Sequence, residues 1–491
     1  MTGLAARSGR HDAARAAACA AALHRLETTG VDEVRIGWCD LHGVLRGKTL
    51  MPAAVPSALD DGIGMVSTLM LKDTSDRTAF RVFERATHDE LPGFGFANNL
   101  VLLPDPASLI VLPWAPGTAW MRGEPYFEDG TPVPADPRRV LQQASQGLAE
   151  AGFDLRCGLE VEFHIYRITD ERLDPAQAAW PGEPPAVRLL HPGYNLLAEN
   201  WADQAHEALA IVRRTAQGLG LPLRSLEIEL GPSQFEAVFD VQDALQAADH
   251  MVLFRNGVRQ ALRRAGYHAT FMCRPPFEHI MSSGWHLHQS LAQRSDGRNA
   301  FVPTAARDGT GAGDAAATLS DVGVHWLGGL LEHAAGTAVF GCSTANAFGR
   351  FRPNALAPMA ASWGRDNRGA MLRVLGGPGD PGTRIENRIG EPMANPYLYM
   401  ASQVHAGLDG LRRRLEPGPA TESPYADNPA RPLPTRLDLA LDALEADTAI
   451  VQAFGADLVR LLTRVKRSEA LRLGQSDDPD AWQRREYFSR F

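Results

Sequence analysis

The sequence has few of the features that mark disulfide-stabilised, zinc-binding and membrane-spanning proteins. It contains only five cysteines in 491 residues, without any Cys-x-x-Cys spacing. They are Cys19, Cys39, Cys157, Cys273 and Cys342. Its apolar stretches are interrupted by histidine, glycine or charge before they reach the ~18 to 20 residues of a membrane-spanning helix. We therefore expect free thiols and exclude a disulfide framework, a thiolate zinc site and a membrane span.

An excess of positive charge is also missing. The formal net charge is −9 at pH 7 and the sequence pI is about 5.9, which argues against partners such as nucleic acids or acidic membranes. The alanine-rich start, His11 to Leu23, lacks the leucine-rich run of a secretory signal. The cytoplasm is the expected compartment.

The length and pattern of the chain predict two domains in an α+β fold. Residues 12–28 predict a helix that ends at Gly30, and residues 34–50 predict a β-hairpin that turns at Asp40 to Gly43. Residues 123–139 are rich in proline, glycine and acid, and Asp136-Pro137 is typical of a helix start. We predict an N-terminal helix over residues 1–29, a strand-rich domain over 30–122, a linker over 123–137 and a larger domain over 138–491.

Polar side chains gather on one face of several predicted strands in the larger domain. Residues two apart in a strand point to the same side, as do Glu160 with Glu162 and His286 with His288. The segment RIENR places Arg384, Glu386 and Arg388 in the same way. Glu229 and Glu236 are an odd number of residues apart, but Gly231-Pro232 between them bends the chain and allows both to turn inward.

Each of these faces alone would fit an exposed charged surface or a satisfied polar core. Together they are harder to explain in that way, because neighbouring carboxylates repel one another unless a cation neutralises them. Carboxylates with an imidazole are the ligands of Mg²⁺ or Mn²⁺, and paired metals that bridge phosphate oxygens are common in phosphoryl transfer.

Residues 350–373 form a basic segment in this acidic chain. It contains five arginines and one acid, Asp366. The arginines are Arg350, Arg352, Arg365, Arg368 and Arg373. Such a set is suited to binding a carboxylate and a phosphoryl group. Leu356 is unexpected there, in the loop from Pro353 to Pro358, because an exposed leucine gains nothing from water.

The ordered motifs resemble those of the glutamine synthetase family. They are GLEVEF, ELGPSQFE, GWHLHQSL, NAFGRF, DNRGAMLR, RIENR and ANPYL, and the resemblance covers about residues 30–487. It implies an N-terminal β-grasp domain and a catalytic domain built on a curved antiparallel sheet with surrounding helices. It also implies a homo-oligomer of stacked rings, typically a dodecamer, with active sites between subunits.

The resemblance also implies roles for individual residues, with ATP and two or more Mg²⁺ or Mn²⁺ ions as cofactors. Glu162, Glu229 and Glu236 match the ligands of one metal ion. Glu160, His286 and Glu386 match those of the second. Arg350, Arg368 and Arg388 match arginines that bind substrate carboxylates and the phosphoryl group, whereas Arg373, Arg384, His288 and Ser290 lie near the nucleotide.

The resemblance is broken at the amine pocket. Glutamine synthetases carry a glutamate at the position of Leu356, and a second acidic motif of their ammonium pocket is unrecognisable here. An ammonium or alkylammonium ion has a pKa near ~10 and needs carboxylates to bind and deprotonate it, whereas an aromatic amine is already neutral at pH 7. We therefore predict a γ-glutamyl amide ligase that joins glutamate to an aromatic amine such as aniline, or to a small alkyl amine.

Several alternatives remain at this stage. A polyamine would fit if Asp73, Asp76 or Glu199 reached the pocket, and ammonium would make the chain an authentic glutamine synthetase. Met281 and Ser282 stand where the family contacts glutamate, so a modified acid is a further alternative. A non-catalytic oligomer would be expected to have lost metal ligands, and a metal-dependent hydrolase would give the arginines no role.

Overall fold

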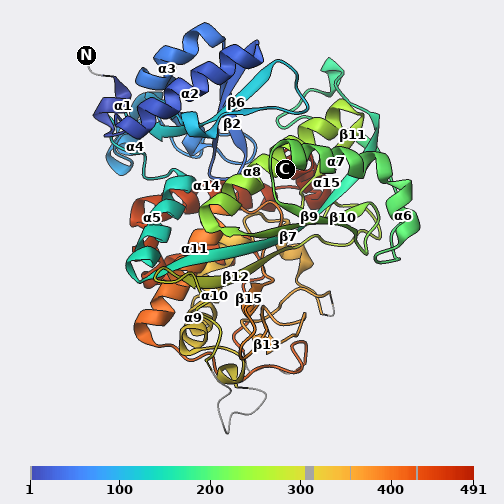
Figure 1. The fold of residues 1–491 in the computed structure, drawn as a ribbon. Coiled ribbons are helices and arrows are strands. Elements are labelled where there is room, and N and C mark those ends of the chain that lie inside the picture. Colours follow the sequence, from blue (N-terminus) through green and yellow to red (C-terminus); the bar gives the residue numbers. More distant parts are fainter. Residues whose placement is uncertain (1–2, 305–313, 354, 427–429) are drawn as a thin grey trace.

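The N-terminal domain lies above the larger domain in Figure 1, where the chain runs from blue to red. The structure is a computed structural model that describes residues 3–304, 314–353, 355–426 and 430–491. Within these ranges the N-terminal sheet has six strands in the order β2-β1-β6-β4-β3, with β5 beside β6. Its elements are α1 (Leu4–Arg7), α2 (Ala13–Thr29), β1 (Glu33–Cys39), β2 (Leu45–Leu50), α3 (Val55–Asp61), β3 (Ile63–Val66), α4 (Arg85–Glu90), β4 (Asn99–Pro104), β5 (Ile110–Val111) and β6 (Thr118–Tyr126).

The pairing of the N-terminal strands agrees with the predicted β-grasp domain. Strand β1 pairs antiparallel with β2 and parallel with the later strand β6. Helix α2 packs on this sheet through Ala22 and Leu26, which share a buried cluster with Val34, Ile36 and Met121. The apolar contact between helix and sheet removes these side chains from water and stabilises the domain.

Local capping signals explain why these first elements end where they do. The side chain of Asp12 accepts a hydrogen bond from the Arg15 amide at 2.7 Å, and Gly30 ends α2 with a left-handed φ of 60°. In the hairpin turn, Asp40 Oδ1 accepts hydrogen bonds from the amides of His42 and Val44, both at 2.9 Å. The predicted helix and hairpin are both confirmed.

The connection between the domains is shorter than the proline-rich pattern predicts. Strand β6 continues through residue 126, so residues 123–126 belong to the sheet. Helix α5 (Pro137–Glu150) begins at its predicted cap, where the Asp136 side chain accepts from the Arg138 amide at 3.2 Å. The strand extends because Val101 and Leu102 of β4 pair with Tyr126 and Pro125.

The larger domain is built on a curved nine-stranded sheet within the described residues. The strand order is β13-β14-β15-β12-β7-β10-β9, with β8 and β11 also paired to β7. The strands are β7 (Phe153–Asp170), β8 (Ala186–Leu189), β9 (Leu223–Ile228), β10 (Gln234–Asp243), β11 (Tyr267–Thr270), β12 (Trp285–Gln293), β13 (Trp363–Arg365), β14 (Leu372–Leu375) and β15 (Arg384–Asn387). The predicted curved antiparallel sheet is confirmed, with one parallel pair, β13 with β14, at its edge.

Helices complete this domain around the sheet (Figure 1). After α5 they are α6 (Glu199–Gln204), α7 (His206–Gly218), α8 (Ala244–Arg264), α9 (Asp321–Glu332), α10 (Ala334–Gly341), α11 (Pro396–Arg413), α12 (Leu437–Ala446), α13 (Thr448–Phe454), α14 (Ala456–Gly474) and α15 (Pro479–Tyr487). None of the described helices combines the length and apolar character needed to cross a membrane.

The long strand β7 separates the core from the candidate site. Its residues Leu159, Val161 and Phe163 are at most 1% exposed and belong to the main apolar cluster. Phe163 packs edge-on against Phe254 of α8, with ring centroids 5.9 Å apart. Since alternate residues of a strand point to opposite sides, this packing turns Glu160 and its even-numbered neighbours away from the core.

A buried histidine joins three helical segments and should make stability depend on pH. His333 lies between α9 and α10, and its Nδ1 and Nε2 are 2.7 Å from Asp447 and 2.9 Å from Asp409. Burial would lower its pKa, but the hydrogen bonds to both carboxylates outweigh burial and raise the pKa above 6.5. The stabilising contribution is therefore complete below pH 6.5 and is lost as pH rises through the folded-state pKa.

We expect His333→Gln to lower the thermal unfolding midpoint more at pH 6 than at pH 8.5. His325→Gln on the same helix α9 is the matched control, because His325 contacts the Leu415 carbonyl at 3.2 Å and has one exposed carboxylate, Glu416, at 3.7 Å in place of the two close carboxylates of His333. Equal losses for His333→Gln at both pH values would contradict a charged His333.

Candidate functional site

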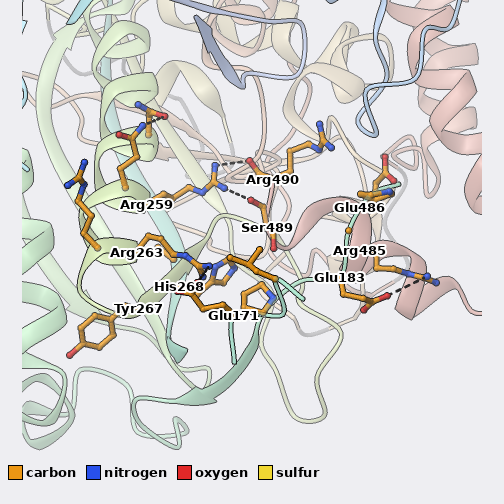
Figure 2. A pocket seen from close by; sticks show the side chains of 18 residues that line it. Glu171, Glu183, Arg259, Arg263, Tyr267, His268, Arg485, Glu486, Ser489 and Arg490 are labelled. Carbon is orange, nitrogen blue, oxygen red and sulfur yellow. Dashed lines mark hydrogen bonds and ion pairs between the residues drawn. The ribbon is translucent and has the colours of Figure 1, made fainter. Parts of the chain in front are cut away.

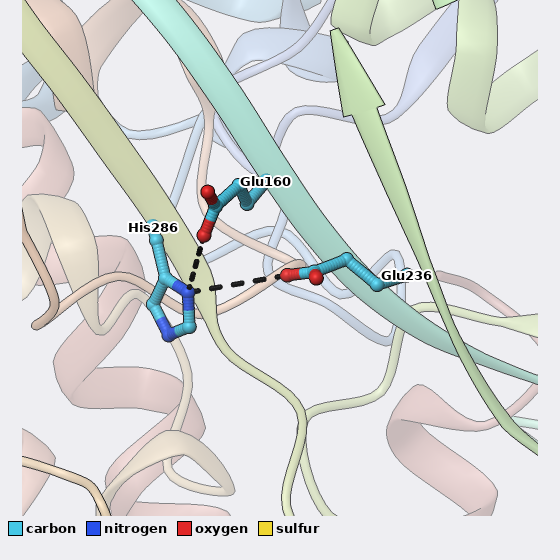
Figure 3. A group of neighbouring side chains, drawn as sticks. All are labelled: Glu160, Glu236 and His286. Carbon is cyan, nitrogen blue, oxygen red and sulfur yellow. Dashed lines mark hydrogen bonds and ion pairs between the residues drawn. The ribbon is translucent and has the colours of Figure 1, made fainter. Parts of the chain in front are cut away.

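The candidate site lies on the polar face of the sheet, where three strands present acidic and histidine side chains. His286 of β12 stands directly opposite Glu160 of β7, and Glu236 of β10 stands opposite Glu162. Figure 3 shows Glu160, Glu236 and His286 converging from these three strands. The strand register, rather than local spacing, therefore brings the predicted residues together.

His286 is the centre of this cluster. Its Nδ1 lies 3.3 Å from Glu160 Oε2, 3.8 Å from Glu386 Oε1 and 4.0 Å from Glu236 Oε1. Its Nε2 lies 3.8 Å from Glu162 Oε1. Four of the five other predicted metal ligands therefore surround one imidazole, and this donor set suits a divalent cation.

The structure groups these donors differently from the two sets that the resemblance implies. One group that could hold a cation contains Glu160, Glu236 and His286, and another contains Glu160, His288 and Glu386. In each group the ligand atoms lie within 4.8 Å of one another. Glu160 belongs to both groups, and His288, expected near the nucleotide, becomes a candidate ligand.

Glu162 and Glu229 lie beside the turn between β9 and β10. Glu162 Oε2 accepts hydrogen bonds at 3.0 Å from Gln234 Nε2 and from the Gly284 amide. Glu229 follows β9 directly, and its amide donates to the Gln234 carbonyl at 3.0 Å. The predicted bend is thus a tight turn. Gln234, which the sequence reading did not single out, orients Glu162 from within the same ELGPSQFE motif.

Burial makes several of these carboxyls hard to ionise in the metal-free chain. Burial and the nearby Glu229 raise the pKa of Glu162 to about 8. Burial, with Glu162 and Glu160, raises the pKa of Glu236 to about 10. Burial also raises the pKa of Glu229. A divalent cation would oppose these shifts, because it replaces the mutual repulsion of the carboxylates by attraction.

Glu160 and His286 show the opposite behaviour. Burial alone would raise the pKa of Glu160, but hydrogen bonds from His286 and His288 outweigh it and hold this pKa well below its usual range. Burial and the Arg388 guanidinium lower the pKa of His286 to about 4. His286 is therefore neutral at pH 7, which is the form in which imidazole binds metals.

Three predicted arginines lie around Glu386 and His288. Glu386 is fully buried and accepts from Arg373 Nη1 at 2.9 Å and from Arg388 Nη1. The Nε of Arg384 contacts His288 Nδ1 at 3.0 Å. Burial would raise the pKa of Glu386, but Arg388 outweighs it and lowers this pKa. The strand RIENR thus supplies both an ionised acid and two of the cations beside it.

The two remaining predicted site arginines, Arg350 and Arg368, both belong to the basic segment and are placed differently. Arg350 is buried and donates to the carbonyls of Ile389 at 2.7 Å and Gly390 at 2.6 Å. A Cβ at Gly284 would lie 2.9 Å from Arg350 Nη2, so the glycine leaves room for this guanidinium beside Glu162. Arg368 is exposed in the β13–β14 connection and lines a cavity of about 480 Å³ there, rather than contacting the carboxylate cluster.

A second cavity, of about 690 Å³, adjoins the cluster on the side of Glu160. His288, Ser290 and Arg384 line it, as expected of residues near a nucleotide, and Val241 lines it as well. Val241 is 67% exposed, although it is apolar. A cavity of this size, with a charged end and an apolar wall, is suited to a nucleotide.

Leu356 lies at the mouth of the site. Its side chain is 55% exposed and its backbone has a left-handed φ of 53°. Arg388 Nη2 contacts the Leu356 carbonyl at 3.5 Å, which places the loop beside the arginine that holds Glu386. Asn354, in the same loop, lies outside the described residues. Packing in the protein core therefore does not explain a leucine with an exposed side chain and a left-handed backbone at this position.

A second apolar loop lies on the side of Glu229. The amides of Tyr194 and Leu197 donate to the carbonyls of Leu230 and Ile228, at 2.7 and 3.0 Å, on either side of Glu229. Tyr194, Leu196 and Leu197 are each more than half exposed. These side chains, which the sequence reading missed, add apolar surface beside an acidic cluster.

Comparison with known proteins agrees with this geometry. The family model described as "Glutamine synthetase, catalytic domain" matches residues 134–487. The sheet, its cluster of carboxylates and histidines and the adjoining cavity are those of a ligase that forms C–N bonds. The chain belongs to the glutamine synthetase family, whose enzymes use ATP and divalent metal ions.

The relatives differ in the amine that their names record. A gamma-glutamylanilide synthase of an Acinetobacter species is 36% identical over 95% of both chains. The gamma-glutamylethanolamide synthetase GlnA4 of Streptomyces coelicolor is 31% identical over 91% of both. A glutamine synthetase of Thermus thermophilus is also 31% identical, over 91% of this chain and 94% of its own. A solved GmaS/ADP complex is 28% identical, with a TM-score of 0.73 over 94% of this chain and 98% of its own.

Proposed function

We propose that this chain joins the γ-carboxylate of glutamate to an organic amine in an ATP-dependent reaction, with an aromatic or small alkyl amine preferred over ammonium. The observation that carries the preference is Leu356, which is 55% exposed at the mouth of the site where glutamine synthetases have a glutamate. Similarity to an anilide synthase and an ethanolamide synthetase supports the same reaction class.

The apolar mouth favours an amine that arrives neutral or carries an apolar substituent. Leucine offers no charge to attract ammonium and no base to deprotonate it. It can instead cover a ring or alkyl group, which gains ~25 cal/mol for each Å² removed from water. Leu196 and Leu197, at 52% and 61% exposure, supply further apolar surface beside Glu229.

The cluster residues would hold two or more Mg²⁺ or Mn²⁺ ions, and their donor chemistry fits this role. The proposed ligands are Glu160, Glu162, Glu229, Glu236, His286 and Glu386. When bound, such ions would neutralise the nucleotide phosphates. Arg350 and Arg388 would bind the substrate carboxylates and the phosphoryl group, and Arg373, Arg384, His288 and Ser290 would face ATP. Arg368, which is exposed in the β13–β14 connection, would join them only if this connection moved toward the cluster.

The proposed reaction has two chemical steps. The γ-phosphoryl group of ATP moves to a γ-carboxylate oxygen of glutamate, which gives γ-glutamyl phosphate and ADP. The amine nitrogen then attacks the carbonyl carbon, the bond from this carbon to the phosphate oxygen breaks, and the nitrogen loses a proton. The arginines stabilise the negative charge that develops on the phosphoryl oxygens.

The polyamine alternative lacks support within one subunit. Asp73 is buried and its Oδ2 pairs with Arg472 Nε at 3.0 Å. Asp76 Oδ1 pairs with Arg46 Nη2 at 2.8 Å. Glu199 is exposed at the start of α6. Two of the three acids that could hold a second ammonium group are therefore already paired with arginines.

We further propose a cytoplasmic homo-oligomer of stacked rings with active sites between subunits. The five cysteines are all free, as expected of a reducing compartment. Neighbouring subunits would then complete the amine pocket. Size-exclusion chromatography with light scattering measures the mass of the oligomer and therefore the number of subunits.

The test is phosphate release by the purified chain with ATP, Mg²⁺ and glutamate across ammonium, isopropylamine, ethanolamine, putrescine, aniline and no amine, with the product mass checked. Turnover with an apolar amine and little with ammonium is the expected result. A preference for ammonium would make the chain a glutamine synthetase, and turnover without ATP would indicate a hydrolase. If no amine gives phosphate release, the chain either uses another acid substrate or is a non-catalytic oligomer. Met281, which stands where the family contacts glutamate, would be the first residue to examine for a different acid.

A further inference from the structure

A third cavity lies away from the carboxylate cluster, between the end of α8 and the C-terminal segment. It has a volume of about 810 Å³ and shares no lining residue with the cavity beside Glu160. Figure 2 shows its walls, which come from α8 and β11, from residues 171–185 after β7, and from residues 485–490. Three segments far apart in the sequence therefore meet around it.

Its lining carries more positive than negative charge. Five arginines line it, namely Arg259, Arg263, Arg264, Arg485 and Arg490, against the three acids Glu171, Glu183 and Glu486. Each acid is already paired: Glu171 with Arg263 at 3.5 Å, Glu183 with Arg485 at 3.6 Å and Glu486 with Arg472 at 2.6 Å. Arg259, Arg264 and Arg490 form no ion pair with any described residue.

Arg259 shows how the excess charge is accommodated. Its Nη1 donates to the Arg490 carbonyl at 2.7 Å and its Nη2 to the Ser489 carbonyl, so both acceptors are neutral (Figure 2). Burial, with Arg255 and Arg490 nearby, lowers the pKa of Arg259 to about 10. A lowered arginine pKa indicates that the charged form is poorly compensated.

Arg490 is the least satisfied of these side chains. Its Nε is buried and has no hydrogen-bond partner within the described residues. Burial, with Arg46 nearby, lowers the pKa of its guanidinium, although Glu486, Asp76 and Asp40 act in the opposite direction. Leaving a charged group incompletely satisfied in a partly buried place costs free energy, and an anion in the adjoining cavity would offset this cost by compensating the guanidinium charge.

We propose that this cavity binds a small polyanion, a molecule carrying a phosphate group or several carboxylates, held by Arg490, Arg259 and Arg263. The guanidinium group matches both kinds of anion, because its planar fork donates two parallel hydrogen bonds to a pair of oxygens. Ser489 lines the same cavity and carries a neutral hydroxyl group, whereas the Tyr267 hydroxyl donates to Glu207 Oε2 at 3.0 Å. The site is separate from amide formation and does not depend on it.

Occupancy of this cavity would also fix the C-terminal segment. Arg259 already donates to the carbonyls of residues 489 and 490. In the same C-terminal segment, Glu486 accepts a hydrogen bond from the Ser75 hydroxyl of the N-terminal domain at 2.5 Å. A bound anion bridging Arg259, Arg263 and Arg490 would tie this segment more firmly to α8. The two domains would be joined more firmly as a result, and the whole chain would gain thermal stability.

The test is the thermal unfolding midpoint of the full chain, freed of metal by EDTA, in increasing inorganic phosphate or citrate at constant ionic strength set with sodium chloride. We expect a saturable rise in the midpoint with at least one of the two anions, and none with chloride alone. The anion that acts distinguishes phosphate from polycarboxylate recognition. In Arg490→Gln and Arg263→Gln the apparent affinity should fall by about 10- to 100-fold, as expected for loss of a charged hydrogen-bond donor.

Two control variants separate this site from others. Arg214→Gln removes an exposed arginine of α7 outside the cavity, and Arg384→Gln removes an arginine of the cavity beside Glu160. Both should retain the anion effect. The proposal is overturned if neither anion raises the midpoint, if Arg490→Gln and Arg263→Gln bind as the wild type does, or if Arg384→Gln alone abolishes binding. Should Arg490→Gln not fold, Arg263→Gln, whose partner Glu171 is largely exposed, decides the matter.

Discussion

Replacing Glu236 by glutamine is expected to reduce ATP-dependent amide formation by about 1000-fold or more without destabilising the metal-free chain. Glu236 is buried and its pKa is raised to about 10, so the folded metal-free protein carries a neutral carboxyl at pH 7. Glutamine has the same shape and is neutral, but it cannot become the anionic ligand of a cation. A phosphoryl transfer that depends on metal ions should then fail.

The same variant should change the response to metal and to pH. In the wild type, Mg²⁺ should raise the unfolding midpoint more at pH 9 than at pH 6.5, because protons compete with the cation for Glu162 and Glu236, whose pKa values are about 8 and about 10. Without metal, the unfolded state loses the Glu236 proton near pH 4.5 and the folded state near pH 10, so stability falls as pH rises between them. Glu236→Gln should weaken both effects.

Glu227→Gln is the matched control for this prediction. Glu227 lies directly opposite Glu236 on β9 and accepts a hydrogen bond from Ser225 at 2.8 Å. It is not a proposed ligand, so its activity should stay within a few-fold of the wild type. Normal turnover and a normal Mg²⁺ response in Glu236→Gln would show that Glu236 does not bind metal.

Replacing Leu356 by glutamate is expected to raise the ratio of kcat/KM for ammonium to that for isopropylamine by about 100-fold or more. A carboxylate here would attract the ammonium ion and accept its proton, a service worth ~10²- to 10⁴-fold in rate. It would also expose a charge to the alkyl group of the competing amine. The loop should tolerate the change, because Leu356 is 55% exposed and glutamate faces the same backbone cost at a φ of 53°.

Leu356→Gln separates the loss of apolar surface from the gain of charge. The glutamine variant should lose about 10-fold in kcat/KM for isopropylamine or aniline without gaining ammonium activity, since it removes apolar contact and supplies no base. Product masses and phosphate release measure both amines in one assay. If Leu356→Glu kept the wild-type preference, the amine would be selected by other residues, of which Leu196 and Leu197 are the nearest candidates on the side of Glu229.

Local sequence patterns predicted much of the scaffold. The Asp12 and Asp136 caps, the Asp40 turn and the two-residue spacing of Glu160 with Glu162 all depend on neighbours a few residues away. Such signals survive in a single sequence because backbone geometry repeats every two residues in a strand and every 3.6 in a helix. The motif order then indicated the family, the sheet and the identity of the donor side chains.

Long-range pairing decided what those patterns could not. Glu160 and His286 are 126 residues apart, and only the register of β7 with β12 brings them within 3.3 Å. The same register makes Glu160 common to both groups of donors and brings His288 into one of them. Arg368, which its motif predicted as a site residue, does not lie on the cluster, because the β13–β14 connection holds this side chain at the surface.

The sequence by itself determined the types of residue in the site, the capped helices and turns, and the missing glutamate at Leu356. Only the tertiary structure decided which carboxylates share a cation, that Tyr194, Leu196 and Leu197 lie exposed beside Glu229, and that Arg490 meets Arg259 around a cavity. The physical reason is the same in each case. Spacing along the chain fixes the direction of a side chain locally, whereas proximity depends on strand register and on packing between distant segments.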